Sequence, residues 1–294
     1  MKVVNCSRLS DYLKLLQDIG ETLHKQGIKF VIIKSAMRTD LSIVPRDVDV
    51  LVHKEHSISE VLSVMKEKGF RPIQIREAEI RLIKTQKYEG LTDLYVDLYF
   101  RIQYLGVRFG WLEEYIFRSP ELLDLEDISI PVPQIEAEFT LNAFHSFLGH
   151  NLFMIYDFAL CNTIIGRHRR KILSVIKNNA MIGSWPSWIP SLIGEYVSIW
   201  LDLKALPFKH RVTLLPRPVY SKTLLRTDFE FSKKVLHLVN YFIIAKIVST
   251  YKRLTKDRGE LKYGKRRHKF EKIAQAMLFA FEERKGSSHG IKRK

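Results

Sequence analysis

The chain has 294 residues, of which 46% are hydrophobic and 27% are charged, and its formal net charge is +16. This composition is that of a globular protein and excludes a largely disordered chain. Two cysteines are too few for a disulfide framework, residues 1–13 lack the apolar core of a signal peptide, and the apolar stretches 185–203 and 235–250 are interrupted by charges. We therefore expect an intracellular, cytoplasmic protein without an integral membrane segment.

The first 100 residues alternate between helical and strand-like patterns. Apolar residues at helical spacing alternate with short β-type runs, which together predict a mixed sheet with helices packed against it. The predicted helices are 10–25 and 58–68, and the predicted strands are 29–33, 47–52, 71–75, 80–85 and 94–100.

Prolines at positions 120, 131 and 133 interrupt this pattern and mark the predicted domain boundary. Beyond them most segments have helical spacing, so the predicted fold class is α+β, with a mostly helical second domain. We predict a sheet domain over 1–133, a helical basic domain over 134–284 and a disordered basic tail over 285–294. The predicted helices of the second half are 135–148, 154–165, 169–176, 190–203, 229–251 and 269–283, with a connecting loop over 204–224.

Two of the predicted strands carry acidic residues in otherwise apolar runs. Asp47 and Asp49 are two residues apart, and side chains at that spacing in a strand project from the same face. Asp97 lies within the run Tyr95–Tyr99. Carboxylates brought together among apolar residues repel each other, and hard divalent cations such as Mg²⁺ relieve that repulsion while also accepting substrate phosphates. The pattern indicates metal-assisted transfer of a nucleotide.

These motifs resemble the nucleotidyltransferase superfamily, which has the DNA polymerase β-like fold. The closest resemblance is to a poorly characterised prokaryotic and archaeal branch with a Lys-Gly-type turn, an Arg before the acid pair and a Val-Asp-Leu-His-type third site. It covers roughly residues 25–160, and departs at the turn, which has Lys-Ser, and at Tyr99, where the branch often has His. The matching segments are Lys34-Ser35-Ala36, Arg46-Asp47-Val48-Asp49 and Val96-Asp97-Leu98-Tyr99.

The resemblance implies a catalytic nucleotidyltransferase domain that moves a nucleoside monophosphate from a nucleoside triphosphate, such as ATP, to an acceptor hydroxyl. In that interpretation Asp47 and Asp49 hold two Mg²⁺ or Mn²⁺ ions, and Asp97 ligates the catalytic ion and helps to activate the attacking hydroxyl. Ser35 would bind a phosphate oxygen, and Lys34 and Arg46 are candidate partners of the triphosphate. The alternative for Arg46 is an ion pair with a neighbouring acid.

Other catalytic patterns are not evident in the sequence. A glycine-rich P-loop is missing, which disfavours a kinase or ATPase of that kind. His145 and His150 are five residues apart, which in an α-helix separates them by about 140° and argues against a shared zinc ion. We interpret these histidines, with Asp157, as structural.

The charge is concentrated in the second half of the chain. Residues 1–150 contain 19 basic and 22 acidic residues, whereas residues 151–294 contain 29 and 10. Such an asymmetry is typical of a protein with a polyanionic partner, and aromatic residues within basic stretches suit RNA. The alternative is a basic surface that serves solubility. The candidate RNA-binding residues are Lys262, Lys265, Arg266 and Arg267.

Three other interpretations stay open at this point. The acceptor can be a protein or a small molecule, with the basic half making oligomer contacts. The chain can also be a non-catalytic nucleic-acid-binding protein on the same fold, although retained acids argue against it. The third, peripheral membrane attachment through residues 235–256, is the weakest. The sequence leaves the nucleotide, the acceptor and the oligomeric state undetermined.

Overall fold

The computed structural model describes residues 6–34, 47–76, 78–84, 95–104, 106–125, 128–150, 152–153, 155–177, 185–204, 213–214 and 224–256. The fold is α+β, as predicted, and is built around a mixed five-stranded sheet. The chain divides into two compact units. Unit 1 comprises Met1–Gln103, Arg108–Ala143 and Met154–Arg211, and unit 2 comprises Tyr104–Val107, Phe144–Phe153 and Val212–Lys294.

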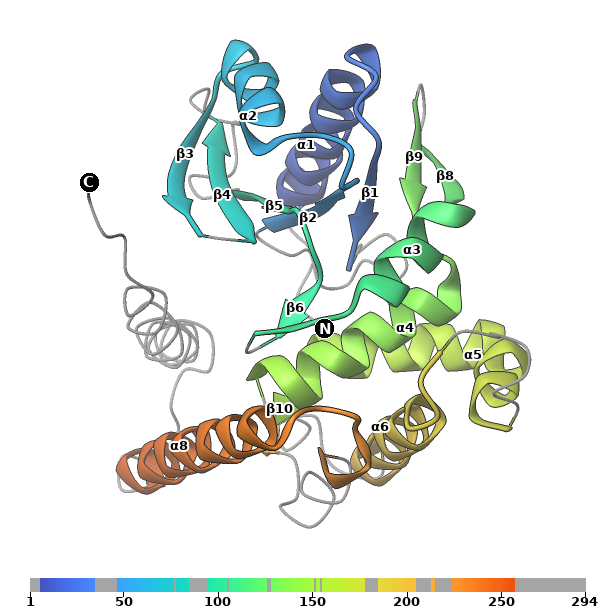
Figure 1. Cartoon of the computed structure of the whole chain (residues 1–294), viewed down its shortest axis with the longest axis vertical. Helices are drawn as coiled ribbons and strands as arrows, with labels where there is room; N and C mark the ends of the chain where they lie inside the picture. Colours follow the sequence, from blue (N-terminus) through green and yellow to red (C-terminus); the bar gives the residue numbers. More distant parts are fainter. Residues whose placement is uncertain are drawn as a thin grey trace. The chain divides into compact units, whose positions relative to one another are not determined.

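The central sheet belongs to unit 1, and its strands follow the order β1-β2-β5-β4-β3 (Figure 1). β2 and β5 pair in parallel, whereas the other three pairs are antiparallel. All five strands fall on segments that the sequence predicted. Their bounds are β1 Phe30–Ile33, β2 Asp47–Val52, β3 Phe70–Ile75, β4 Glu79–Lys84 and β5 Tyr95–Tyr99.

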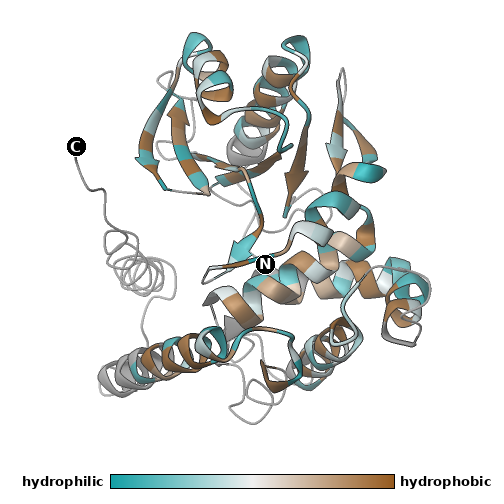
Figure 2. Cartoon of the chain, viewed as in Figure 1, coloured by the Kyte–Doolittle hydropathy of each residue, from teal (hydrophilic) through white to brown (hydrophobic). Residues whose placement is uncertain are grey.

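Helices α1 (Cys6–Lys25) and α2 (Ile58–Glu67) contact each other and share one hydrophobic core with the sheet (Figure 1). Alternate strand residues enter this core because successive side chains of a strand point to opposite faces. In Figure 2, β1 is brown along its length, whereas β3 and β4 alternate between brown and teal. The strand residues in the core include Phe30, Ile32, Val48, Val50, Val52, Ile80, Leu82, Val96 and Leu98.

The rest of unit 1 contains a hairpin and several helices. The sequence did not predict α3 (Gly110–Arg118), whose N-cap Phe109 makes no side-chain hydrogen bond, or β8 (Glu121–Leu125). β8 pairs with β9 (Ile128–Val132), which packs against β1 and α1. The remaining elements are β6 Gln103–Tyr104, β7 Val107–Arg108, α4 Ile135–Phe144, α5 Ile155–Lys177 and α6 Ile189–Lys204. Each of β6 and β7 has one residue in unit 1 and one in unit 2.

Two helical segments differ from the prediction in detail. The helices predicted over 154–165 and 169–176 form one element, α5, with a kink at His168, where φ is −124° and ψ is 25°. The helix predicted over 135–148 changes at His145 into the π-helix η2 (His145–His150). Residues five apart in a π-helix are separated by about one turn, so the 140° separation expected for His145 and His150 is wrong.

Unit 2 contains η2, the short pair β10 (Leu152–Phe153) and β11 (Thr213–Leu214), and helix α8 (Phe231–Lys256). β11 lies inside the segment that was predicted to be a loop. The predicted helix over 269–283 and the predicted tail over 285–294 lie outside the described residues. Within the described ranges, none of the helices is both long and apolar enough to traverse a membrane.

Candidate active site

The three predicted acids lie together on the sheet face opposite the core shared with α1 and α2. Asp49 and Asp97 are register partners across the parallel pair β2–β5, and Asp47 lies two residues before Asp49. Their strand neighbours Val48 and Val96 point into the core. The alternation therefore places all three carboxylates on one face of two adjacent strands.

Burial and mutual repulsion make two of these acids hard to ionise. The pKa of Asp47 is raised to about 7, first because the surrounding protein removes much of the hydration of its carboxylate and then by the negative charges of Asp49 and Asp97. Burial also raises the pKa of Asp49, although Lys34 opposes that rise. The Asp47 side chain is 39% exposed, whereas that of Asp97 is 2% exposed. Asp47 is therefore the acid of the three that solvent reaches most easily.

Lys34 directly follows β1 and supplies one of the positive charges of the site. Its Nζ lies 3.4 Å from Asp49 Oδ2 and 5.2 Å from the centre of the Tyr99 ring. Its φ is +52°, in the left-handed region that costs a residue with a Cβ about 1–2 kcal/mol. Such strain is concentrated at functional sites. The Tyr99 hydroxyl donates to Asp49, and burial raises the pKa of Tyr99 well above 10.

Arg81, on β4, supplies the second positive charge. The sequence motifs did not indicate this residue. Its Nε donates to Asp97 Oδ1 at 2.6 Å and its Nη2 donates to Asp97 Oδ2 at 2.5 Å. Nη2 also lies 3.9 Å from Asp47 Oδ2, and the guanidinium lies 5.6 Å from the centre of the Tyr95 ring. The hydrogen bonds to Asp97 raise the already high pKa of Arg81. Arg81 therefore ties two of the three acids together.

A further ion pair lies where the polar face reaches the start of β4. Arg76 Nη1 lies 3.0 Å from Glu79 Oε2, and both side chains are 16% exposed. Burial raises the pKa of Glu79, and the charge of Asp97 adds to that rise. Glu79 and Arg81 are two residues apart in a strand whose intervening residue, Ile80, enters the core. This alternation was the signal in the sequence that could have shown that Glu79 and Arg81 share one face of their strand. That this face also carries the acids follows from the strand order.

The acids match a divalent cation in chemical type, since carboxylate oxygens are the ligands that Mg²⁺ and Mn²⁺ prefer. The raised pKa values of Asp47 and Asp49 are also those expected of a cluster with too much negative charge. Among the residues that the structure describes, however, no group of three or more Asp, Glu, His or Cys side chains is arranged to hold a metal ion. Both oxygens of Asp97 are bonded to Arg81 instead.

Several of the predicted site residues lie outside the described part of the chain. These are Ser35 and Arg46 of the proposed nucleotide site, together with Lys262, Lys265, Arg266 and Arg267. Of the residues interpreted as structural, Asp157 is buried and accepts a hydrogen bond of 2.8 Å from the Tyr196 hydroxyl. That contact agrees with its structural interpretation.

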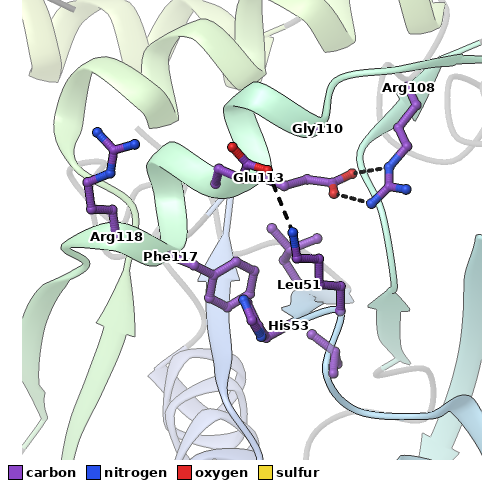
Figure 3. A pocket seen from close by; sticks show the side chains of 10 residues that line it. Leu51, His53, Arg108, Gly110, Glu113, Phe117 and Arg118 are labelled. Carbon is purple, nitrogen blue, oxygen red and sulfur yellow. Dashed lines mark hydrogen bonds and ion pairs between the residues drawn. The ribbon is translucent and has the colours of Figure 1, made fainter. Parts of the chain in front are cut away.

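A hollow of about 590 Å³ lies farther along β2, where the strand ends against α3 (Figure 3). Leu51 and His53 line it, and both follow Asp47 and Asp49 in steps of two residues along the chain. The ring of His53 packs edge-on against Phe117 at 4.7 Å between centroids. Figure 3 also shows the Arg108–Glu113 ion pair in its lining. Lys54 and Glu114, which form a second ion pair, line it too. The hollow thus combines apolar side chains with paired charges.

Comparison of the chain with known protein families and with curated proteins found no match. The functional conclusion therefore rests on the residues of the site and on the resemblance of their motifs.

Proposed function

We propose that this protein is a metal-dependent nucleotidyltransferase that moves a nucleoside monophosphate from a nucleoside triphosphate to an acceptor hydroxyl. The observation that supports the proposal most is the register of Asp49 with Asp97 on one sheet face, with Asp47 beside them. Acids on that face point away from the hydrophobic core, and three of them together destabilise the fold unless cations balance them, of which Lys34 and Arg81 are two. A reaction that needs a divalent cation gives a reason for keeping them.

In this proposal Asp47, Asp49 and Asp97 hold Mg²⁺ or Mn²⁺. The chemistry that the bound ion supplies is charge stabilisation at the phosphate under attack. Lys34 fits a role at the triphosphate because its ammonium lies beside Asp49, at the end of β1. Tyr99 orients Asp49 by donating a hydrogen bond to it. The proposed roles of Ser35 and Arg46 at the phosphates follow from the motif resemblance.

The acceptor that we favour is RNA, because residues 151–294 carry 29 basic residues against 10 acidic ones. A surface of that charge attracts a phosphate backbone. A protein or small-molecule acceptor is the alternative, and the hollow beside His53 and Phe117 is the observation that favours a small one. It lies on the strand that carries Asp47 and Asp49.

The two hydrogen bonds from Arg81 to Asp97 favour a second candidate function, a non-catalytic nucleic-acid-binding protein. In such a protein Arg81 would be a permanent counter-ion, and the site would have no use for a metal ion. The two candidates differ in a measurable way, since only the enzyme transfers a nucleotide.

The test is incubation of the full chain with each labelled nucleoside triphosphate, Mg²⁺, and either total RNA or total protein. We expect label in one acceptor fraction and none in the presence of excess chelator. Asp47→Asn should reduce transfer by about 100-fold or more, because it removes a charge from the metal site. It should leave the fold intact, because Asp47 is part-exposed and its ion pair with Arg81 is long, at 3.9 Å.

Asp202→Asn is the matched control, since it makes the same charge change at an exposed position of α6. It should leave transfer unchanged. Equal transfer by the wild-type chain and the Asp47→Asn variant, or transfer that persists in chelator, contradicts the proposal. Salt-dependent RNA binding without any transfer supports the non-catalytic candidate instead.

A further inference from the structure

Arg81 holds the carboxylate of Asp97, which would have to be free in order to bind a metal ion. One continuous row of register partners crosses the sheet from Asp49 on β2 through Asp97 on β5 to Arg81 on β4. Both guanidinium hydrogen bonds to Asp97 are short, at 2.5 and 2.6 Å, and use both of its oxygens. Asp97 is thereby matched to a cation that belongs to the chain itself.

A divalent cation and the Arg81 guanidinium compete for the same carboxylate. Each requires the lone pairs of Asp97, and the two positive charges repel each other when they share one acid. The competition extends to Asp47, whose Oδ2 is 3.9 Å from Arg81 Nη2. A metal ion held by both acids therefore requires Arg81 to move away.

Arg81 is able to make such a move without any change in the backbone. Its guanidinium is the end of a long side chain on a regular strand, and the side chain is 28% exposed. A planar guanidinium also matches phosphate with two parallel hydrogen bonds, which makes Arg the preferred side chain for a triphosphate.

We infer that Arg81 is a positioning residue with two positions: it holds Asp97 in the metal-free chain, and moves to the nucleotide phosphates once a divalent cation takes Asp97. The inference rests on the proposed function and extends it, because it couples the binding of metal to the binding of nucleotide. With a divalent cation held by these acids, Arg81 would leave Asp97, and its released guanidinium would then strengthen nucleotide binding. A ligand shifts such an equilibrium only through its different affinity for the two arrangements, which competition for Asp97 provides.

The first test compares metal affinity with nucleotide affinity in Arg81→Met. Binding of Mn²⁺ alone is measured by isothermal titration calorimetry, and binding of a non-hydrolysable ATP analogue is then measured at saturating Mn²⁺. We expect Mn²⁺ to bind about 10-fold more tightly to the variant than to the wild type, and the analogue about 10-fold more weakly, since one charge-assisted bond is worth roughly that factor. Arg81→Lys should retain part of both effects, and Arg71→Met, at an exposed position of β3, should cause neither.

Opposite changes in the two affinities are the decisive result, because a variant that is merely damaged loses both. Unchanged or weaker Mn²⁺ binding by a folded Arg81→Met variant overturns the inference. Failure of the wild type to bind either ligand overturns the proposed function as well. The two conclusions can also separate. If the wild type binds both ligands and transfers a nucleotide, but Arg81→Met has unchanged Mn²⁺ affinity, the proposed function stands and only the role of Arg81 is wrong.

The second test uses the wild-type chain, in case Arg81→Met does not fold. Phenylglyoxal modifies accessible guanidinium groups, and mass spectrometry of peptides reports the modification of Arg81 alone. Mn²⁺ should increase that modification by releasing Arg81 from Asp97, and addition of the ATP analogue should suppress it again. Modification of Arg81 that Mn²⁺ leaves unchanged, in a chain shown to bind Mn²⁺, overturns the inference.

Discussion

At the scale of single residues, the polar face of the sheet combines acidic and basic side chains that come from different strands. Asp47, Asp49 and Asp97 share the face with Lys34 and Arg81, and each of the two cations lies against a particular acid. The acid with the least direct partner is Asp47, and its pKa is raised to about 7. The incomplete balance predicts that the stability of the fold depends on pH.

The contribution of Asp47 to the free energy of unfolding should fall as the pH rises from about 4 to about 7. In that interval the folded chain keeps a proton on Asp47 that the unfolded chain has released, because the pKa of Asp47 is raised in the fold. A folded state that binds more protons than the unfolded state loses stability with rising pH. Below this interval both states are protonated, and above it both are ionised, so the contribution is constant there.

Denaturant unfolding of the wild type and of Asp47→Asn, measured at several pH values between 4 and 8, checks this expectation. The variant cannot ionise at position 47, so its stability relative to the wild type should increase with pH across the interval. Asp202→Asn, on exposed α6, corrects for the general loss of one negative charge. A stability difference between wild type and Asp47→Asn that is the same at every pH contradicts the assignment.

At the scale of elements, helix α2 illustrates a boundary that the local sequence determines. Ser57 caps the helix by accepting a hydrogen bond of 3.2 Å from the Glu60 backbone amide. The Glu60 side chain accepts one of 3.2 Å from the Ser57 amide in return. This reciprocal capping box satisfies two backbone donors that the first turn otherwise leaves unpaired. Helix α3 has no such signal, which explains why the sequence did not predict it.

Ser57→Ala should therefore lower the free energy of unfolding by about 1 kcal/mol, the usual cost of removing a helix N-cap. Ser63→Ala is the matched control, because Ser63 is exposed within the same helix and Ala is the better helix former. It should leave stability unchanged or raise it slightly. Denaturant unfolding measures both, and equal effects of the two substitutions would show that the capping box contributes nothing.

At the scale of the whole molecule, the charge asymmetry between the two halves of the chain is the largest electrostatic feature. The N-terminal half carries slightly more acids than bases, and the surplus of positive charge belongs to residues 151–294. The acids of the candidate site and the candidate RNA-binding residues are thus far apart in the sequence. That separation allows the two functions to be tested by different substitutions.

If the basic half binds RNA, affinity should fall steeply with salt, with a log–log slope of about −0.7 for each phosphate neutralised on a single strand. Changing Lys262, Lys265, Arg266 and Arg267 together to Glu should weaken binding and flatten that slope, while nucleotide binding at Asp47 and Asp49 is unaffected. The control changes Lys54, Lys66, Lys68 and Arg71 to Glu, at exposed positions of the N-terminal half. Filter binding of a labelled single strand over a salt series is the measurement.

Equal slopes in the wild type and in the variant with four C-terminal changes would contradict the RNA assignment and favour a protein or small-molecule acceptor. A loss of binding as large in the N-terminal control would mean that binding depends on net charge rather than on these four residues.

The sequence by itself determined the five strands of the central sheet and the facing of Asp47 and Asp49. Strand bounds followed from apolar alternation, and β2 begins and ends at the predicted residues, Asp47 and Val52. The parity of Asp47 and Asp49 was likewise local, because side chains two apart in any strand share a face. The charge asymmetry between the two halves follows from counting their basic and acidic residues. None of these features depends on which segments come together in space.

The tertiary structure alone decided which partners those acids have. That β5 lies between β2 and β4 brings Arg81 onto Asp97 from 16 residues away, and no local pattern specifies that strand order. The register of Asp49 with Asp97 spans 48 residues in the same way. Strand pairing of this kind is set by the packing of the whole sheet against α1 and α2, where a shift of one residue would turn the apolar face outward. The sequence was enough to identify the acids, whereas their counter-ions could be identified only from the order and register of the strands in the folded sheet.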